Sequence, residues 1–223
     1  MTPFTLLYFL LALLLYVAAV PFLLLFSLKK KYRRSLPARF FLWNNPPFRH
    51  VDLWFHVCSL GESRALKPLL DSLPARDIGI TAITQTGYDA ARHYDAQVRY
   101  LPFEIFLPFW IRRPKTLVVL EAEFWYMLFV VASVRGAKVI VLNARISERS
   151  YPKYLKFRWF YQKIFHYVDT FFVQSEHDKV RFESLGARHI VVLGNMKLAQ
   201  RIVATTHYDK LNVETIVAAS THE

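Results

Sequence analysis

Short apolar runs alternate with helical patterns from residue 51 onward, and this alternation is the feature that most constrains the fold. The runs are rich in branched and aromatic residues and occupy residues 53–58, 78–84, 98–100, 116–120, 138–142, 170–173 and 189–193. Apolar residues at helical spacing lie between and after them, over residues 62–72, 88–94, 106–112, 123–135, 154–167 and 176–185. This order is typical of a parallel sheet covered by helices on both faces. The sequence therefore predicts an α/β, Rossmann-like domain over residues 51–200.

The first predicted strand ends in a small turn that holds a carboxylate. Ser59, Gly61 and Glu62 follow the strand, and a helical pattern begins at Glu62. Ligands of open α/β sheets bind beyond the carboxyl ends of the strands. Glu62 is therefore placed where a general base could meet a substrate hydroxyl. The alternative is that Glu62 is only a first-turn acid favoured by the helix dipole.

Polar residues follow the ends of other predicted strands as well. They lie at residues 84–87, 121–123, 143–145, 174–176 and 194–197. In a parallel sheet these ends meet Glu62 at one edge, which predicts a binding site there. No metal-ligand spacing, phosphate-binding glycine loop or nucleophile elbow is present, so we expect neither a metal nor a cofactor.

Cys58 is the single cysteine of the chain. One cysteine excludes an internal disulfide and agrees with a reducing compartment. Cys58 could be a nucleophile assisted by His56, two residues earlier on the same strand face. A buried strand thiol is the favoured interpretation, since free cysteines are among the most buried residues.

The N-terminal 28 residues carry no charge and are mostly Leu, Phe, Ala and Val. They are long enough to cross the hydrocarbon core of a bilayer as a helix, with Pro21 as a potential kink. Lys29, Lys30, Lys31, Arg33 and Arg34 follow, and positive charge after the run predicts that the next domain stays cytoplasmic. A helix lying flat in the interface or buried in a soluble core is the alternative.

Basic and aromatic residues mix in two segments. Residues 29–50 suit the headgroup region of a membrane, and residues 151–167 would form a basic, aromatic helix. For that helix, a membrane surface and a solvated helix with an aromatic core face remain equal alternatives. The formal net charge of +12 predicts a polyanionic partner: nucleic acid, anionic lipid or a phosphorylated substrate. No nucleic-acid recognition motif is present, so we expect no nucleic-acid partner.

An ordered set of short motifs resembles the N-terminal half of the 3-deoxy-D-manno-octulosonic acid (Kdo) transferases, which build the inner core of lipopolysaccharide. The matching motifs occupy residues 59–62, 84–87, 100–103, 121–125, 143–147, 194–197 and 219–223. The resemblance implies a GT-B fold, in which two Rossmann-like domains face a cleft, with this chain supplying the acceptor domain. It also implies transfer of Kdo from CMP-Kdo to a hydroxyl of the lipid A precursor, with inversion and without a metal, at the cytoplasmic face of the inner membrane.

The resemblance also implies roles for single residues. Glu62 matches the general base, and Glu121 and Lys197 match residues that stabilise the transition state. Glu121 could instead hold Lys197 or stabilise positive charge on the sugar ring. Residues that would bind substrate are Ser59, Gly61, Thr86, Gly87, Arg145 and Asn195.

Three departures from the family pattern stand out. Gln85 and Tyr126 replace prolines of the family, and these are local turn changes. Residues 201–223 match a linker and the start of the donor domain, and the chain ends at Glu223. We therefore expect a truncated chain without a complete donor site. Two other functions stay open: a non-catalytic, membrane-anchored domain that binds lipid A, and a GT-B glycosyltransferase that uses a UDP-sugar.

Overall fold

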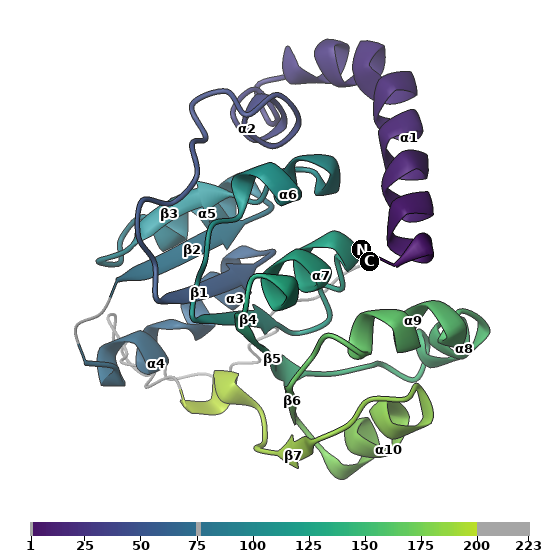
Figure 1. Cartoon of the computed structure of the whole chain (residues 1–223). Coiled ribbons are helices and arrows are strands. Elements are labelled where there is room, and N and C mark those ends of the chain that lie inside the picture. Colours follow the sequence, from purple (N-terminus) through teal and green to yellow (C-terminus); the bar gives the residue numbers. More distant parts are fainter. Residues whose placement is uncertain (1, 75–76, 200–223) are drawn as a thin grey trace, which may run out of the picture.

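A computed structural model describes residues 2–74 and 77–199 of the chain. Within them, seven parallel strands form one sheet in the order β3-β2-β1-β4-β5-β6-β7 (Figure 1). The strands are β1 (Leu53–Val57), β2 (Ile78–Ala82), β3 (Gln97–Tyr100), β4 (Thr116–Leu120), β5 (Lys138–Ala144), β6 (Thr170–Val173) and β7 (Ile190–Val192). The predicted α/β class and all seven predicted strands are confirmed, with ends that differ by a few residues. The predicted linker at residues 201–223 and the motif at 219–223 lie outside the described residues.

Alternate residues of each strand face opposite layers of helices, which is why the central strands β1, β2 and β4 are mostly apolar. On β4, Leu117 and Val119 pack into one core cluster, and Val118 and Leu120 pack into the other. The first face is covered mainly by α7 (Tyr126–Val134), by α9 (Arg158–Phe165) and by α10 (Glu176–Ser184). The second face is covered by α3 (Leu60–Ala65), α4 (Lys67–Ser72) and α5 (Gln85–Ala91). Because these central strands are buried on both faces, their sequences are nearly continuous apolar runs rather than alternating apolar and polar residues.

Several predicted helices have different limits in the structure. The helix predicted over residues 62–72 is divided at Leu66 into α3 and α4, because Pro68 has no N–H to donate to the carbonyl oxygen of Arg64. The helix predicted over residues 154–167 begins earlier, as α8 (Tyr151–Lys156), and breaks at Phe157 before α9. The prediction over 106–112 was too long at its end, since α6 (Leu107–Trp110) follows a short 3-10 turn, η1 (Glu104–Phe106).

Two short elements complete the described chain. Helix α2 (Ser35–Phe40), which was not predicted, lies in the basic and aromatic segment. A 3-10 turn, η2 (Met196–Ala199), follows β7. Gly136 and Gly186 end helices with φ of 86° and 90°, as their positions in the sequence predict.

The uncharged N-terminal stretch forms α1 (Pro3–Ser27), which lies beside α7 and α9 (Figure 1). Contacts with the domain come from one face of this helix. The Thr5 and Tyr126 hydroxyls are 2.9 Å apart, the Tyr8 hydroxyl donates to Glu104, and the Tyr16 hydroxyl donates to the Phe40 carbonyl oxygen at 2.7 Å. Helix α1 is therefore part of the tertiary structure, although its other face is bare.

The carboxyl of Glu104 beneath α1 makes stability depend on pH. Burial raises the pKa of Glu104 to about 7, whereas an unfolded glutamate titrates near about 4.3. Between these values the folded state binds more protons than the unfolded state, so the free energy of unfolding falls as pH rises through this window. We expect Glu104→Gln to flatten this fall, as measured by urea denaturation from pH 4.5 to 7.5 in a neutral detergent. Glu148→Gln, at an exposed carboxyl, is the matched control and should keep the wild-type slope; equal slopes in all three proteins would contradict the prediction.

Candidate active site

The strand order reverses between β1 and β4, and this reversal places the candidate site. From β1 the chain continues outward through β2 and β3, and it then returns to β4 on the other side of β1. The loops that leave β1 and β4 therefore turn to opposite sides and leave a crevice at the carboxyl edge of the sheet, where ligands of such folds bind. Glu62 follows β1 and Glu121 follows β4, so the two predicted carboxylates flank the crevice.

Glu62 closes the first turn of α3 as half of a capping box. Its backbone N–H lies 3.4 Å from the Ser59 hydroxyl oxygen; its Oε1 accepts from that hydroxyl at 2.8 Å, and its Oε2 accepts from the Cys58 N–H at 2.7 Å. The alternative in which Glu62 is a first-turn acid therefore describes its local structure. The carboxylate can still accept a proton from a substrate, since each oxygen keeps a second lone pair.

The electrostatics of Glu62 suit a base. Its side chain is buried, and burial raises the pKa of its carboxyl; the hydrogen bonds from Cys58 and Ser59 oppose this, and the charges of Glu121 and Glu123 add to it. A raised pKa gives a stronger base, which favours acceptance of a proton from a hydroxyl.

The turn after β2 is tied to the turn after β1. The Thr84 hydroxyl donates to the Cys58 carbonyl oxygen at 2.8 Å, and the Ser63 hydroxyl donates to the Gly87 carbonyl oxygen at 2.8 Å. A Cβ at Gly87 would lie 3.1 Å from the Cys58 carbonyl oxygen, so this position excludes larger residues. Gly87 thus holds two backbones close together, while Thr86 beside it is exposed.

Lys197 reaches the other side of the crevice. Its ammonium lies 2.6 Å from Glu121 Oε1, which joins the two predicted transition-state residues directly. The backbone of Glu121 is left-handed, with φ of 58°, and that of Asn143 has φ of 59°. Such conformations cost of order 1–3 kcal/mol and cluster at functional sites. Asn143 Oδ1 accepts from the Met196 N–H at 3.0 Å and so positions the loop that carries Lys197.

The remaining predicted residues are less closely gathered. Asn195 Oδ1 accepts from the Lys197 N–H at 3.0 Å and shapes the same loop. Asn143 and Asn195 also line a cavity of about 400 Å³ between α4 and the loop after β7. Arg145 is exposed, with no hydrogen bond or ion pair to any described residue, so the structure does not bring it into the cluster.

Arg39 and Glu123 also belong to the site region. Glu123 lies in the polar strand end at residues 121–123 that predicts a site, although no role was predicted for it alone, and nothing in the sequence points to Arg39. Arg39 comes from α2, donates to the Leu101 carbonyl oxygen at 3.0 Å and lies 5.6 Å from the centre of a Trp125 ring. Burial lowers its pKa to about 10, so it stays charged at neutral pH. Glu123 accepts from the Trp125 indole N–H at 3.0 Å. No local pattern identifies Arg39, because only the docking of α2 brings it to the sheet.

Cys58 is not poised as a nucleophile. Burial raises the pKa of its thiol to about 12, and the charges of Glu123 and Glu62 add to the effect. Burial lowers the pKa of His56 to about 3, so its imidazole is neutral, and it bonds to Thr81 at 3.0 Å. A thiol rather than a thiolate is therefore present at neutral pH, which argues against the nucleophile. The predicted buried strand thiol is only partly right, since Cys58 is half-buried and follows the last residue of β1.

Among residues 2–74 and 77–199, His, Cys, Asp and Glu form no group of three or more that could hold a metal ion. The gathered polar residues are two acids, a lysine and backbone-bound hydroxyls, which is a set for acid–base and electrostatic chemistry.

Comparison with known sequences assigns the chain to a family. The sequence model described as 3-deoxy-D-manno-octulosonic-acid transferase (kdotransferase) matches residues 33–200. The chain belongs to this transferase family. A relative from Chlamydia pneumoniae, named 3-deoxy-D-manno-octulosonic acid transferase, is 31% identical over 195 residues, which cover 81% of this chain and 45% of the relative. The transferase of the same name from Rickettsia bellii is 27% identical over 235 residues, covering 96% of this chain and 56% of the relative.

A third relative combines two activities in its name. The bifunctional glycosyltransferase/methyltransferase of Fusobacterium nucleatum is 32% identical over 164 residues, which cover 66% of this chain and 25% of the relative. The chain thus spans about half of the length of the two Kdo transferase relatives and a quarter of the bifunctional one.

The capping box makes Ser59 a test of local structure apart from catalysis. Ser59→Ala removes both side-chain bonds to Glu62, and loss of an N-cap costs about 1 kcal/mol. We expect the free energy of unfolding to fall by that amount in urea denaturation. Ser59→Asp keeps an N-cap acceptor but places a second carboxylate beside Glu62, and the two repel each other when both are charged. We therefore expect the free energy of unfolding of Ser59→Asp to be closer to the wild-type value at pH 4 than at pH 8. A Ser59→Ala variant as stable as the wild type would contradict the capping role.

Proposed function

We propose that this chain supplies the acceptor half of a glycosyltransferase that moves Kdo from CMP-Kdo to a hydroxyl of the lipid A precursor, with inversion. The observation that carries the proposal is the pairing across the strand reversal, with Glu62 on one side and the Glu121–Lys197 ion pair on the other. Membership of the transferase family supports the same chemistry. The acceptor would enter at the carboxyl edge of the sheet.

Glu62, Lys197 and Glu121 each have a separate role in the proposed reaction. The Glu62 carboxylate takes the proton of the acceptor hydroxyl while that oxygen forms a bond to the anomeric carbon of Kdo. The bond from this carbon to the CMP phosphate breaks at the same time, and the electron pair leaves with the phosphate oxygen. Lys197 stabilises the negative charge that grows on the phosphate. Glu121 holds the lysine at 2.6 Å and keeps its ammonium directed into the crevice.

The substrate-binding residues surround this pair in the proposal. Ser59 and Gly61 shape the turn that presents Glu62. Thr86 and Gly87 form the wall after β2. Asn195 holds the loop of Lys197, and the exposed Arg145 is free to contact a phosphate group of either substrate.

Glu62→Gln tests the base directly. The amide keeps the shape and one capping bond but accepts no proton, and loss of a general base costs about 10²–10⁴-fold in rate. We expect kcat for Kdo transfer to a tetraacyl lipid A precursor to fall by that factor, with little change in KM, in the longest natural protein that contains this sequence.

Two controls accompany the assay. Glu148→Gln, at an exposed carboxyl on the α8 side, should retain wild-type activity. A set of UDP-sugars offered in place of CMP-Kdo should give no product. Near-normal kcat in Glu62→Gln would return this residue to a purely capping role, and transfer from a UDP-sugar would assign a different donor.

We propose further that the protein works at the cytoplasmic face of the inner membrane, with α1 lying along the membrane surface. Helix α1 is long and apolar enough to cross a membrane by length and composition. However, it contacts the domain from Phe4 to Tyr16, a length of about 18 Å at 1.5 Å per residue. If α1 crossed the bilayer, the parts of α7, α9 and η1 that touch it would enter the hydrocarbon core.

The bare face of α1 supports the flat arrangement. It is lined by large exposed apolar side chains: Leu6, Leu7, Leu10, Leu11, Leu13, Leu14, Leu15, Val17, Phe22, Leu24, Leu25 and Phe26. Moving one such side chain fully out of water gains about 1.5–3 kcal/mol. Contact of this face with lipid is therefore strongly favoured over contact with water. Trp159, 56% exposed on α9, adds to this surface beside Phe4, and Lys163 lies over the Phe4 ring. The aromatic core face predicted for residues 151–167 is also present, through Tyr154, Tyr161 and Phe165.

The two ends of α1 distinguish lying from crossing. We expect Thr2→Cys and Leu28→Cys both to react with a membrane-impermeant maleimide added to inside-out inner-membrane vesicles. In the flat arrangement both ends face the same side as the domain. Reaction of Leu28→Cys alone would show that α1 crosses the bilayer. The wild type, whose only cysteine is the half-buried Cys58, gives the background.

A further inference from the structure

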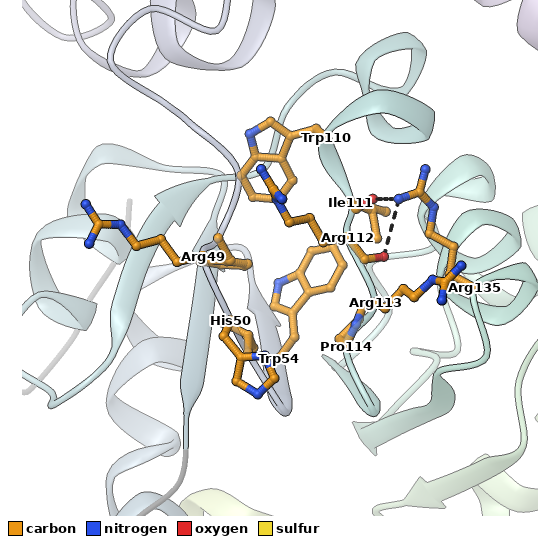
Figure 2. Close-up of a pocket in the computed structure, with 11 residues that line it drawn as sticks. Arg49, His50, Trp54, Trp110, Ile111, Arg112, Arg113, Pro114 and Arg135 are labelled. Carbon is orange, nitrogen blue, oxygen red and sulfur yellow. Dashed lines mark hydrogen bonds between the residues drawn. The ribbon is translucent and has the colours of Figure 1, made fainter.

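A second pocket lies at the opposite end of the sheet from Glu62. Its walls come from the residues that precede β1 and β4 and from the end of α7, so it opens at the amino edge of the sheet (Figure 2). Its volume is about 390 Å³. β1 is five residues long, and at about 3.3 Å per residue it separates this pocket from the turn of Glu62 by more than 15 Å. The pocket is therefore distinct from the candidate active site.

The charge of this pocket is uncompensated. Arginines from three segments line it, namely Arg49, Arg112, Arg113 and Arg135, together with His50, and no acidic residue is among its lining residues. Arg49, Arg112 and Arg113 are exposed and form no ion pair with any described residue. The acids nearest to the pocket, Asp52 and Asp77, face His50 at 3.3 and 3.6 Å.

One arginine is held in place by the backbone. The Arg135 guanidinium donates to the carbonyl oxygens of Pro108, Ile111 and Arg112, which fixes it at one side of the pocket. Figure 2 shows the bonds to Ile111 and Arg112. These partners are neutral, so the positive charge of Arg135 remains. Arg135 can therefore hold an anion at a defined point, and the exposed Arg49 and Arg112 have room to turn toward it.

The floor of the pocket is aromatic and rigid. Trp54 and Trp110 are 1% and 2% exposed, and their ring centres lie 6.1 Å apart. Their indole N–H groups are already used, since Trp54 donates to the Thr81 hydroxyl at 2.9 Å and Trp110 donates to the Asn45 carbonyl oxygen at 2.9 Å. The indole N–H groups are therefore unavailable to a ligand, and the two rings are almost fully buried, so they form a rigid wall behind the pocket. The contacts with a ligand must come from the arginines.

We propose that this pocket binds a phosphate-bearing ligand through its arginines, in front of the rigid wall that the two indoles form. Guanidinium groups pair with phosphate oxygens through two parallel hydrogen bonds, and a phosphate relieves the mutual repulsion of several arginines at once. The shared chemistry fits a lipid phosphate headgroup or a soluble phosphorylated compound. Phe109, 79% exposed on α6 just before this segment, gives the lipid source a direct route to the pocket. This inference does not depend on the transferase proposal.

The test is a fluorescence titration of the full chain in a neutral detergent, with the tryptophans as reporters. The ligands are dihexanoyl phosphatidic acid, sn-glycerol 3-phosphate and, as a net-neutral comparison, dihexanoyl phosphatidylcholine. The pocket variant is Arg49→Gln/Arg112→Gln. The matched control is Arg149→Gln/Arg188→Gln, which removes the same charge from exposed positions outside the pocket. Circular dichroism melting establishes that both variants are folded, and Arg113→Gln alone serves if the double variant is not.

We expect saturable binding of phosphatidic acid that weakens at least about tenfold in the pocket variant and little in the control, since each lost bond to a charged group costs more than a tenfold change in affinity. Tighter binding of phosphatidic acid than of glycerol phosphate assigns a lipid source, and equal binding assigns a soluble phosphorylated ligand. The proposal is overturned if neither phosphate compound saturates, if phosphatidylcholine binds as well as phosphatidic acid, or if the control variant loses as much affinity as the pocket variant.

Discussion

Parallel pairing of β1 with β4 is the constraint on which the rest of this structure depends. The pairing begins at Leu53 opposite Thr116 and continues to His56 opposite Val119. It forces the loops that leave these two strands to turn to opposite sides, because β2 pairs with the other edge of β1. Both ends of the sheet take their character from this reversal. Two acids and a lysine gather at the carboxyl edge, and arginines gather at the amino edge.

Glu62 shows how one side chain can serve structure and chemistry together. Its carboxylate completes the capping box of α3, and the two bonds that it accepts hold it in one orientation. The same bonds oppose the effect of burial on its pKa, yet the pKa is still raised. Orientation and basicity therefore come from a single arrangement. If Glu62 acts as the proposed general base, its capping bonds position it and no separate positioning residue is needed.

Helix α1 is docked on the domain along one side only. The sequence makes α1 equally apolar on all sides, whereas the tertiary structure uses one side for Thr5, Tyr8 and Tyr16 and leaves the other bare. A helix with this division is not independent of the domain. Contact with lipid would hold α7, α9 and α1 at one level, and the carboxyl edge of the sheet would then keep a constant height above the membrane.

The sequence by itself determined the class of the fold, the seven strands and the positions of Glu62, Glu121 and Lys197 at strand ends, because an apolar run buried on both faces has a local signature and its end is visible as a change to polar residues. It did not determine which strand ends meet. The contact of Lys197 with Glu121, the capture of Arg39 beside Trp125 and the arginine pocket join segments that lie far apart in the chain. Nor did it reveal α2, the division of α3 from α4 and of α8 from α9, or the docked face of α1. Only the tertiary structure decided these features, since they depend on strand order and on packing between distant elements, and no local pattern of residues records either.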